Sequence, residues 1–116
     1  MQVQKYSVTI TEDAENDIAE LMAFYEELVD AESAIRFFDE AMETLAGLEK
    51  LPRTNAVFKD NPDVRKVQMA NHKVAVVYLI DDGRFEVIAV RAYHQMQNPS
   101  QYQESVRERI RKYSDN

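Results

Sequence analysis

Hydrophobic and polar residues alternate over residues 4–10, with Tyr6, Val8 and Ile10 on one side of the alternation. A period of two predicts a β-strand with one buried face. Two acidic segments follow, in which apolar residues recur at close to 3.6 residues and so predict amphipathic helices. Thr11 is placed to cap the first helix. Its expected buried stripe is Ala14, Ile18, Leu21, Met22, Tyr25, Leu28 and Val29.

The second helix is expected over residues 31–51, after a short break at Asp30. It should end at Leu51, because the residue before a proline avoids helical angles. Its inward positions are Ala34, Phe37, Phe38, Ala41, Leu45 and Leu48. So short a connection predicts an antiparallel helical hairpin whose apolar stripes cover a sheet. Residues 53–62 are expected to form a loop.

The second half of the chain should supply that sheet. Residues 65–69 alternate, residues 70–73 would turn, and residues 74–80 are apolar enough for a central strand buried on both faces. Residues 85–90 form a similar run, and the intervening Asp81-Asp82-Gly83 predicts a hairpin. On strict alternation, Arg91 and Tyr93 face away from Val90 and Ala92.

A final helix is expected over about residues 100–113, opened by a capping box of Ser100 and Gln103. Tyr102, Val106, Ile110 and Tyr113 form its apolar stripe. The fold class is therefore α+β, in the order β-α-α-β-β-β-α, with the helical hairpin packed on a small, twisted, mostly antiparallel sheet. One domain over residues 1–116 is expected. The helical pair should shield one side of the sheet and leave the other free to engage a neighbour.

The composition favours a small intracellular protein. Its 116 residues include 45% hydrophobic residues, enough for one core, and no cysteine, so disulfides and thiolate chemistry are excluded. No apolar run is long enough for a signal peptide or a membrane span. We therefore expect a cytoplasmic location. The net charge of −7 argues against indiscriminate nucleic-acid binding.

That net charge is unevenly distributed. Residues 12–49 hold thirteen acidic residues and one basic residue, Arg36, whereas residues 50–112 hold twelve basic and seven acidic residues. A basic partner could therefore meet the acidic helices, and a local basic surface could form on the C-terminal half. Asp13 and Asp17 stand one turn apart on the first helix, have no histidine partner, and are expected to be solvated.

Several short motifs, in this order, resemble the RelE/ParE superfamily of bacterial toxin–antitoxin toxins, most of all its ParE or plasmid-stabilisation branch. The resemblance extends over most of residues 5–99. It rests on Tyr6-Ser-Val-Thr-Ile-Thr, Ala14-x-x-Asp17-Ile18, Ala34-x-x-Phe37, Leu48-x-x-Leu51-Pro52, Val76-Val77-Tyr78-Leu79-Ile80-Asp81-Asp82 and Val90-x-x-x-His94-x-x-x-x-Pro99.

The resemblance implies a small toxin that is neutralised by an antitoxin wrapping the sheet and the helical hairpin. ParE-like members inhibit DNA gyrase, and RelE-like members cleave mRNA on the ribosome without a metal. RelE-type nucleases usually carry an arginine three residues before the tyrosine of the central strand, and Ala75 stands there in this chain. His94 matches a family histidine, but Gln95, Met96 and Gln97 replace the arginines that commonly follow it. These departures weaken the case for a ribonuclease.

Metal-free RNA cleavage would need a base, a cation on the phosphate and an acid. The candidate catalytic residues are His94, Arg65, Lys73 and Arg91, and their spacing does not require them to act together. His72, in the expected turn, should be exposed to solvent. Candidate binding residues are Tyr93 and the cations on the outer face of the last helix, Arg107, Arg109, Arg111 and Lys112. No metal site and no cofactor are expected.

Three functions remain open at this stage. The first is a toxin that inhibits a target such as gyrase and is held inactive by a cognate antitoxin. The second is a ribosome-dependent endoribonuclease, and the third is a non-toxic relative that only binds a partner. A homodimer or a heterotetramer with the antitoxin is the expected assembly, and no membrane partner is expected.

Overall fold

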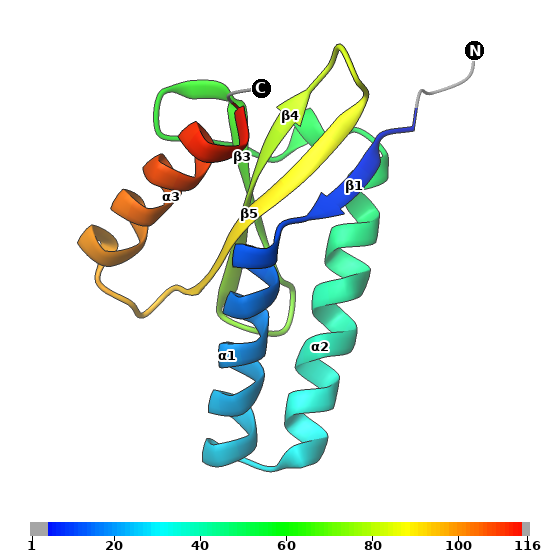
Figure 1. The fold of residues 1–116 in the computed structure, drawn as a ribbon. Coiled ribbons are helices and arrows are strands. Elements are labelled where there is room, and N and C mark those ends of the chain that lie inside the picture. The colour runs from blue at the N-terminus through cyan, green and yellow to red at the C-terminus, as the bar shows by residue number, and fades with distance from the viewer. Residues whose placement is uncertain (1–4, 115–116) are drawn as a thin grey trace.

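The computed structural model describes residues 5–114, whose elements follow the predicted order with one addition (Figure 1). The α+β class is confirmed. The elements are β1 (Ser7–Ile10), α1 (Glu12–Leu28), α2 (Ala31–Ala46), two 3₁₀ turns (Gly47–Glu49 and Pro52–Thr54), β2 (Ala56–Phe58), β3 (Asn61–Gln68), β4 (Val74–Asp81), β5 (Glu86–His94) and α3 (Pro99–Ser114).

The strands form one five-stranded sheet in the order β1-β5-β4-β3-β2. β1 pairs with β5 in parallel, and the other three pairings are antiparallel. The mostly antiparallel sheet is therefore confirmed. β4 lies at the centre, and its residues from Val74 to Ile80 are all buried, as their continuous apolar run predicts.

Helices cover both faces of the sheet. The larger core cluster joins α1 and α2 to one face, through residues such as Ile18, Phe37 and Tyr78. The smaller cluster lies on the other face and includes Val106 of α3. Figure 1 shows α3 and the helical pair as separate bodies on the two sides of the strands. The expectation that the second face stays free is therefore wrong, because the apolar stripe of α3 needs a surface on which to be buried.

The loop predicted over residues 53–62 instead contains β2 and the start of β3. Ala56 pairs with Lys66 and Val57 with Arg65, and the turn between the strands places Lys59 at a φ of 60°. The local sequence hid both strands, since β2 is only three residues long and β3 opens with Asn61 and Pro62, which are poor strand formers. Pairing with existing strands, a tertiary effect, outweighs that weak propensity.

The helical hairpin is shorter and more exposed than predicted. α2 ends at Ala46 and continues as the 3₁₀ turn Gly47–Glu49, so it does not reach Leu51. Leu28, Val29 and Phe38 are exposed, although the period of 3.6 placed them inward. In Figure 1 the closed end of the hairpin extends beyond the strands, so no sheet lies there to cover Leu28 and Val29. Phe38 lies further along α2 and lines a groove between the two helices.

A bulge in β5 changes which side chains share a face. Val77 pairs with Arg91 and Tyr78 with Ala89, so Val90 has no partner across the ladder. Val90 and Tyr93 consequently pack in the α3-side cluster, and Ala92 packs in the helical-pair cluster. Strict alternation, which placed Tyr93 opposite Val90, is wrong here because one extra residue shifts the strand by one position.

Helix caps explain where the helices begin. Thr11 caps α1 as predicted: its Oγ1 accepts from the Ala14 N–H at 3.1 Å and donates to the Ala89 carbonyl at 2.8 Å. α3 begins one residue earlier than expected, and Asn98 replaces Ser100 as its cap. The Asn98 Oδ1 accepts from the Ser100 N–H at 3.1 Å. The predicted β4–β5 hairpin is confirmed, with the positive φ of its turn at Phe85 and not at Gly83.

Candidate functional site

The face of the sheet beneath α3 is where a nuclease centre was considered, and it is apolar. The side chains that pack there from β3, β4 and β5 are Val64, Ala75, Val77, Leu79, Ile88, Val90 and Tyr93, and α3 adds Tyr102, Val106, Ile110 and Tyr113. Only the tyrosines among them carry an ionisable group. A surface of this composition excludes water and offers neither a cation for a phosphate nor an imidazole base.

Tyr93 of β5 and Tyr102 of α3 form a stacked pair. The rings of Tyr93 and Tyr102 lie 3.8 Å apart with an angle of 9° between their planes. Burial, followed by the neighbouring Tyr102, raises the pKa of Tyr93 to about 12. A phenol with this pKa stays protonated at neutral pH. Tyr93, a predicted binding residue, therefore lies in the interface between β5 and α3 and not on an open surface.

The four candidate catalytic residues do not converge on one point. Arg65, on β3, donates to three backbone carbonyls, those of Pro62, Arg53 and Asn55, at 2.9–3.0 Å. It thereby fixes the segment before β2. Lys73 is exposed in the β3–β4 turn, where its carbonyl accepts from the Gln95 N–H. The guanidinium of Arg65 is therefore occupied by backbone acceptors.

Arg91 and His94 lie on β5 beside α1. The Arg91 Nη1 donates to the Asp17 carboxylate at 2.6 Å, and the Arg91 side chain is 13% exposed. His94 ends the strand, where its Nδ1 accepts from the Met96 N–H at 3.1 Å and its ring lies 6.0 Å from that of Phe24. His94 pairs with Val74 and so shares the helical-pair face, whereas Arg91 and Tyr93 pair with Val77 and Ala75 of the α3-side cluster.

Asp17 organises a buried ionic cluster that the sequence reasoning missed. Its carboxylate, 6% exposed, accepts from Arg91, from Arg109 Nη1 at 2.5 Å and from the Ala92 N–H at 3.0 Å. The expectation of a solvated Asp17 is wrong. The sequence did contain a pattern that indicates burial of Asp17, because this residue lies between Ala14 and Leu21 at the spacing of the inward stripe. The cluster ties α1, β5 and α3 together.

The cations of α3 do not share one outer face. Arg109 points inward to Asp17 and to the Val90 carbonyl, at 2.9 Å from the latter. Lys112 contacts Asp13 of α1 at 3.2 Å, and Arg107 and Arg111 are exposed. The hydrogen bond from Tyr113, followed by Lys112, lowers the pKa of Asp13. Arg107, Arg111 and Lys112 thus remain exposed to a partner, and of these Lys112 is already paired with Asp13.

His72 is largely covered, contrary to expectation. Its Nδ1 lies 3.1 Å from Glu40 of α2, and its ring packs edge-on against Tyr25 and Phe37. Asn71 donates to the same carboxylate through its backbone N–H and its side chain. Burial would raise the pKa of Glu40, but these hydrogen bonds outweigh it and hold the pKa below its usual value. The arrangement fastens the β3–β4 turn to α2.

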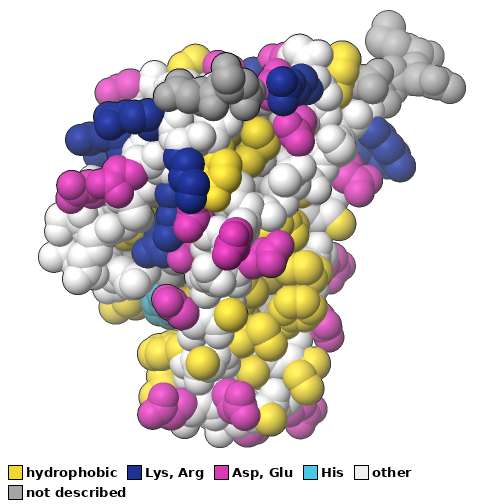
Figure 2. Space-filling model, in the orientation of Figure 1, with side chains coloured by type: hydrophobic (Ala, Val, Ile, Leu, Met, Phe, Trp, Pro, Cys, Tyr) yellow, Lys and Arg dark blue, Asp and Glu magenta, His cyan; other side chains and the backbone are white. Residues whose placement is uncertain are grey.

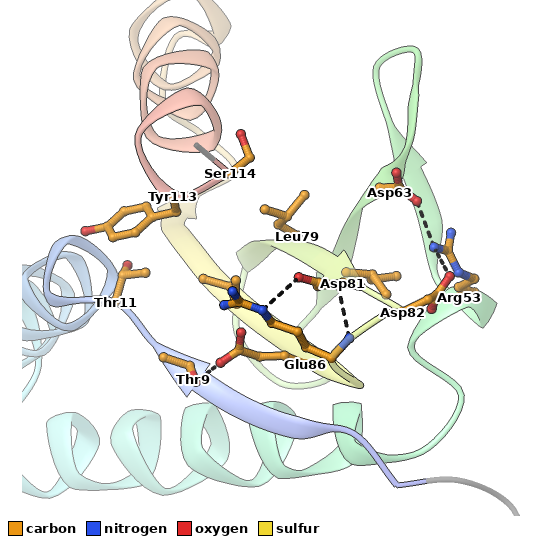
Figure 3. A pocket seen from close by; sticks show the side chains of 13 residues that line it. Thr9, Thr11, Arg53, Asp63, Leu79, Asp81, Asp82, Glu86, Tyr113 and Ser114 are labelled. Carbon is orange, nitrogen blue, oxygen red and sulfur yellow. Dashed lines mark hydrogen bonds and ion pairs between the residues drawn. The ribbon is translucent and has the colours of Figure 1, made fainter. Parts of the chain in front are cut away.

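An open cleft of about 540 Å³ lies at the other end of the sheet, beyond the end of α3 (Figure 3). Its polar side chains are already paired. Thr9 donates to Glu86 at 2.9 Å, and Arg53 bridges Asp63 and Asp82, at 2.7 Å from each. Arg53, followed by Tyr6, lowers the pKa of Asp82. None of the four candidate catalytic residues lines this cleft. Its paired polar side chains therefore hold neighbouring strands and loops together and do not form a catalytic centre.

The outer side of the helical pair carries an apolar groove. It has a volume of about 320 Å³ and lies between α1 and α2. Phe38, 38% exposed, lines it, and Ile35, 57% exposed, precedes Phe38 by one turn of α2. We call this surface the hairpin groove; it is lined by Ile10, Glu15, Ile18, Ala19, Met22, Phe38 and Met42. Figure 2 shows hydrophobic side chains gathered over the helical pair with acidic side chains around them. Exposed apolar patches of this kind mark interaction sites.

Neither a metal site nor a membrane helix is found in the described part of the chain. Within residues 5–114, no three His, Cys, Asp or Glu side chains come together in a way that could hold a metal ion. Over the same residues, none of the helices has the length and apolar character needed to span a bilayer.

The fold is similar to that of solved chains from RelE, RelBE and ParDE toxin–antitoxin systems. A chain of the chromosomal ParDE system of P. aeruginosa matches with a TM-score of 0.67 and 17% identity, over 78% of this chain and 97% of that one. A variant of E. coli toxin RelE in the free state matches with a TM-score of 0.61 and 16% identity, over 93% and 97% of the two chains.

A chain of the RelBE2 toxin–antitoxin complex of Mycobacterium tuberculosis matches with a TM-score of 0.57 and 16% identity, over 83% of this chain and 98% of that one. No protein-family model and no curated protein sequence matches the chain. The RelE/ParE toxin fold expected from the sequence resemblance is thus confirmed, and it is common to the ParDE and RelBE structures.

Proposed function

We propose that this chain is the toxin of a type II toxin–antitoxin pair and that it acts by binding its target, not by cleaving RNA. The fold supports the toxin class. The observation that carries the mode of action is the sheet face beneath α3, which is apolar and covered. Arg91 and His94 line one cleft, where Arg91 is paired with Asp17, whereas Arg65 binds backbone carbonyls and neither it nor Lys73 lines that cleft. DNA gyrase, the target of ParE-like toxins, is the target to test first.

We further propose that a cognate antitoxin covers the hairpin groove. The apolar floor suits an amphipathic helix, a common mode of peptide recognition. Acidic residues dominate α1 and α2, where residues 12–49 carry a single basic residue, so the matching segment should be basic at its margins. Solved structures with this fold include toxin–antitoxin complexes, one with an antitoxin RelB peptide, which supports a site of this kind.

Inducible expression in a bacterial host tests the toxin assignment. We expect growth arrest without translation-dependent mRNA cleavage, and inhibition of DNA supercoiling by the purified protein in a gyrase assay. His94→Ala should leave this toxicity intact. Ordered mRNA cleavage that His94→Ala abolishes would establish the ribonuclease instead, and growth without arrest would establish a non-toxic binding relative.

A matched pair of variants tests the groove. Ile35→Asp places a charge beside the hairpin groove, and Val57→Asp places the same charge on exposed β2. Both side chains are exposed, so both proteins should fold. Coexpression of the neighbouring antitoxin gene should rescue growth from the Val57 variant and fail to rescue it from the Ile35 variant. Equal rescue would place the antitoxin elsewhere.

A cytoplasmic location and the two assemblies, a homodimer and a heterotetramer with the antitoxin, stay predictions. Light scattering of the purified toxin, alone and with its antitoxin, measures the assembly. The ribosome becomes the expected partner in place of gyrase only if mRNA cleavage is observed.

A further inference from the structure

A second cleft, which the proposed function does not use, lies between α1 and the end of β5. It has a volume of about 510 Å³, within the range of ligand pockets. We call it the α1–β5 cleft; it is lined by Asp17, Glu20, Leu21, Phe24, Arg91, Ala92, His94, Met96 and Gln97. It is separate from the hairpin groove, with which it shares no lining residue.

The polar part of this cleft is rich in donors. The Nε of Arg91 is buried and has no hydrogen-bond partner among the described residues. A buried N–H of a charged group that has no acceptor lowers the stability of the fold. A ligand atom that accepts a hydrogen bond from it would therefore be bound with a favourable free energy. His94 accepts the Met96 N–H at Nδ1, which leaves its Nε2 as the protonated, donating nitrogen of the neutral ring. Gln97 adds an amide.

The buried ionic cluster beside the cleft favours an anion. Asp17 lies between the guanidinium groups of Arg91 and Arg109, so this buried cluster carries one positive charge in excess. Glu20 is exposed at the cleft and opposes that charge in part, under the screening of solvent. An anion bound near Arg91 would balance the cluster.

The rest of the lining is apolar and open. Leu21 and Phe24 line it from α1, and Met96, 76% exposed, lines it from the segment after β5. Methionine and aromatic side chains adapt to apolar groups of varied shape and are frequent at binding surfaces. A ligand that fits both parts carries an apolar group next to an acidic one.

We propose that the α1–β5 cleft binds an acidic peptide segment of a protein partner, with an apolar side chain against Phe24 and Met96 and a carboxylate on Arg91. The proposal rests on the proposed function in one respect, that this chain works by binding proteins. The contact would place a partner on the α1 side of β5, at a different site from the hairpin groove.

Two blocked dipeptides test the cleft directly. N-acetyl-Leu-Glu-amide and N-acetyl-Leu-Gln-amide have the same shape and differ in the carboxylate. Each is titrated into the ¹⁵N-labelled full chain while backbone amide shifts are recorded. We expect shifts at Leu21, Ala92, Met96 and Gln97 with the glutamate peptide, with a Kd on the order of millimolar for so small a ligand, and affinity about tenfold weaker for the glutamine peptide.

Variants of the protein test which side chains bind the glutamate peptide. Arg91→Lys keeps a cation for Asp17 but lacks Nε–H, and should weaken the glutamate peptide about tenfold. Glu20→Gln removes the opposing charge at an exposed position and should strengthen binding about two- to threefold. Glu27→Gln, the same change on the same helix outside the cleft, should leave the Kd unchanged. The Glu20 and Glu27 variants keep the test valid if Arg91→Lys fails to fold.

Equal affinity for the two dipeptides would overturn the proposal, since the carboxylate would then play no part. Shifts confined to the exposed cations of α3, or no shifts at all, would overturn it as well. These measurements need no toxicity, so a failed growth assay and a failed titration are separate results.

Discussion

Removing the carboxylate of Asp17 is the most informative single perturbation of this fold. Asp17→Ala would leave Arg91 and Arg109 facing each other with their charges unbalanced, and the Ala92 N–H without its acceptor. The two arginine side chains are 13% and 19% exposed, so water can recover little of the lost interaction. Removing one partner of a buried ion pair typically costs about 3–5 kcal/mol.

We take the lower end, about 3 kcal/mol, because Arg109 can swing outward with the end of α3. This is a large part of the roughly 5–15 kcal/mol by which such domains are stable. With an m value of about 1.5 kcal/mol/M, the urea midpoint should fall by about 2 M. Circular dichroism and tyrosine fluorescence during urea unfolding would measure it.

Asp13→Asn is the matched control, one turn earlier on the same helix. Asp13 also contacts α3, through Lys112 and Tyr113, but its side chain is 30% exposed. Because exposed ion pairs contribute little, its midpoint should move far less than that of the Asp17 variant. The reasoning is refuted if Asp17→Ala costs less than about 1 kcal/mol or no more than Asp13→Asn.

Three further predictions follow from other contacts. The pKa of Glu40 is lowered in the fold, so its carboxylate stabilises the native state above its unfolded pKa. This contribution is lost as the pH falls through the folded pKa. Glu40→Gln should therefore reduce the decline in the urea midpoint between about pH 6 and pH 3. Tyr78→Phe removes the hydroxyl that donates to the Pro52 carbonyl at 2.6 Å and accepts from Asn55 at 2.9 Å, and should lower the free energy of unfolding by roughly 1–3 kcal/mol in the same assay. Burial raises the pKa of Tyr93 from 10.0 to about 12, so its contribution to stability is complete below pH 10 and is lost as the pH rises from about 10 to about 12. Tyr93→Phe should therefore reduce the loss of stability measured between about pH 10 and pH 12.

The candidate site could be anticipated in part. The sequence placed His94 at the end of a strand and Ala75 in place of the family's usual arginine, and both placements bear directly on the argument against a nuclease. It did not reveal that Arg65 binds backbone carbonyls or that Arg109 turns inward. A cationic side chain on a helix or strand has the same local pattern whether its head group reaches solvent or a distant acceptor.

By itself, the sequence determined the elements with strong periodicity. The two helices, their hairpin, the central strand and the capping role of Thr11 all follow from local patterns, because each pattern buries apolar side chains or satisfies backbone groups within its own segment. The order of these elements was enough to indicate the toxin fold.

Tertiary structure alone decided the rest. β2 exists because β3 offers it a partner, and the bulge at Val90 turns Tyr93 toward α3. α3 closes the face of the sheet that the pattern left open, and Asp17 is buried because two arginines from distant segments meet it there. These features depend on pairings between residues far apart in the chain, whose free energy no local pattern of hydrophobic and polar positions contains.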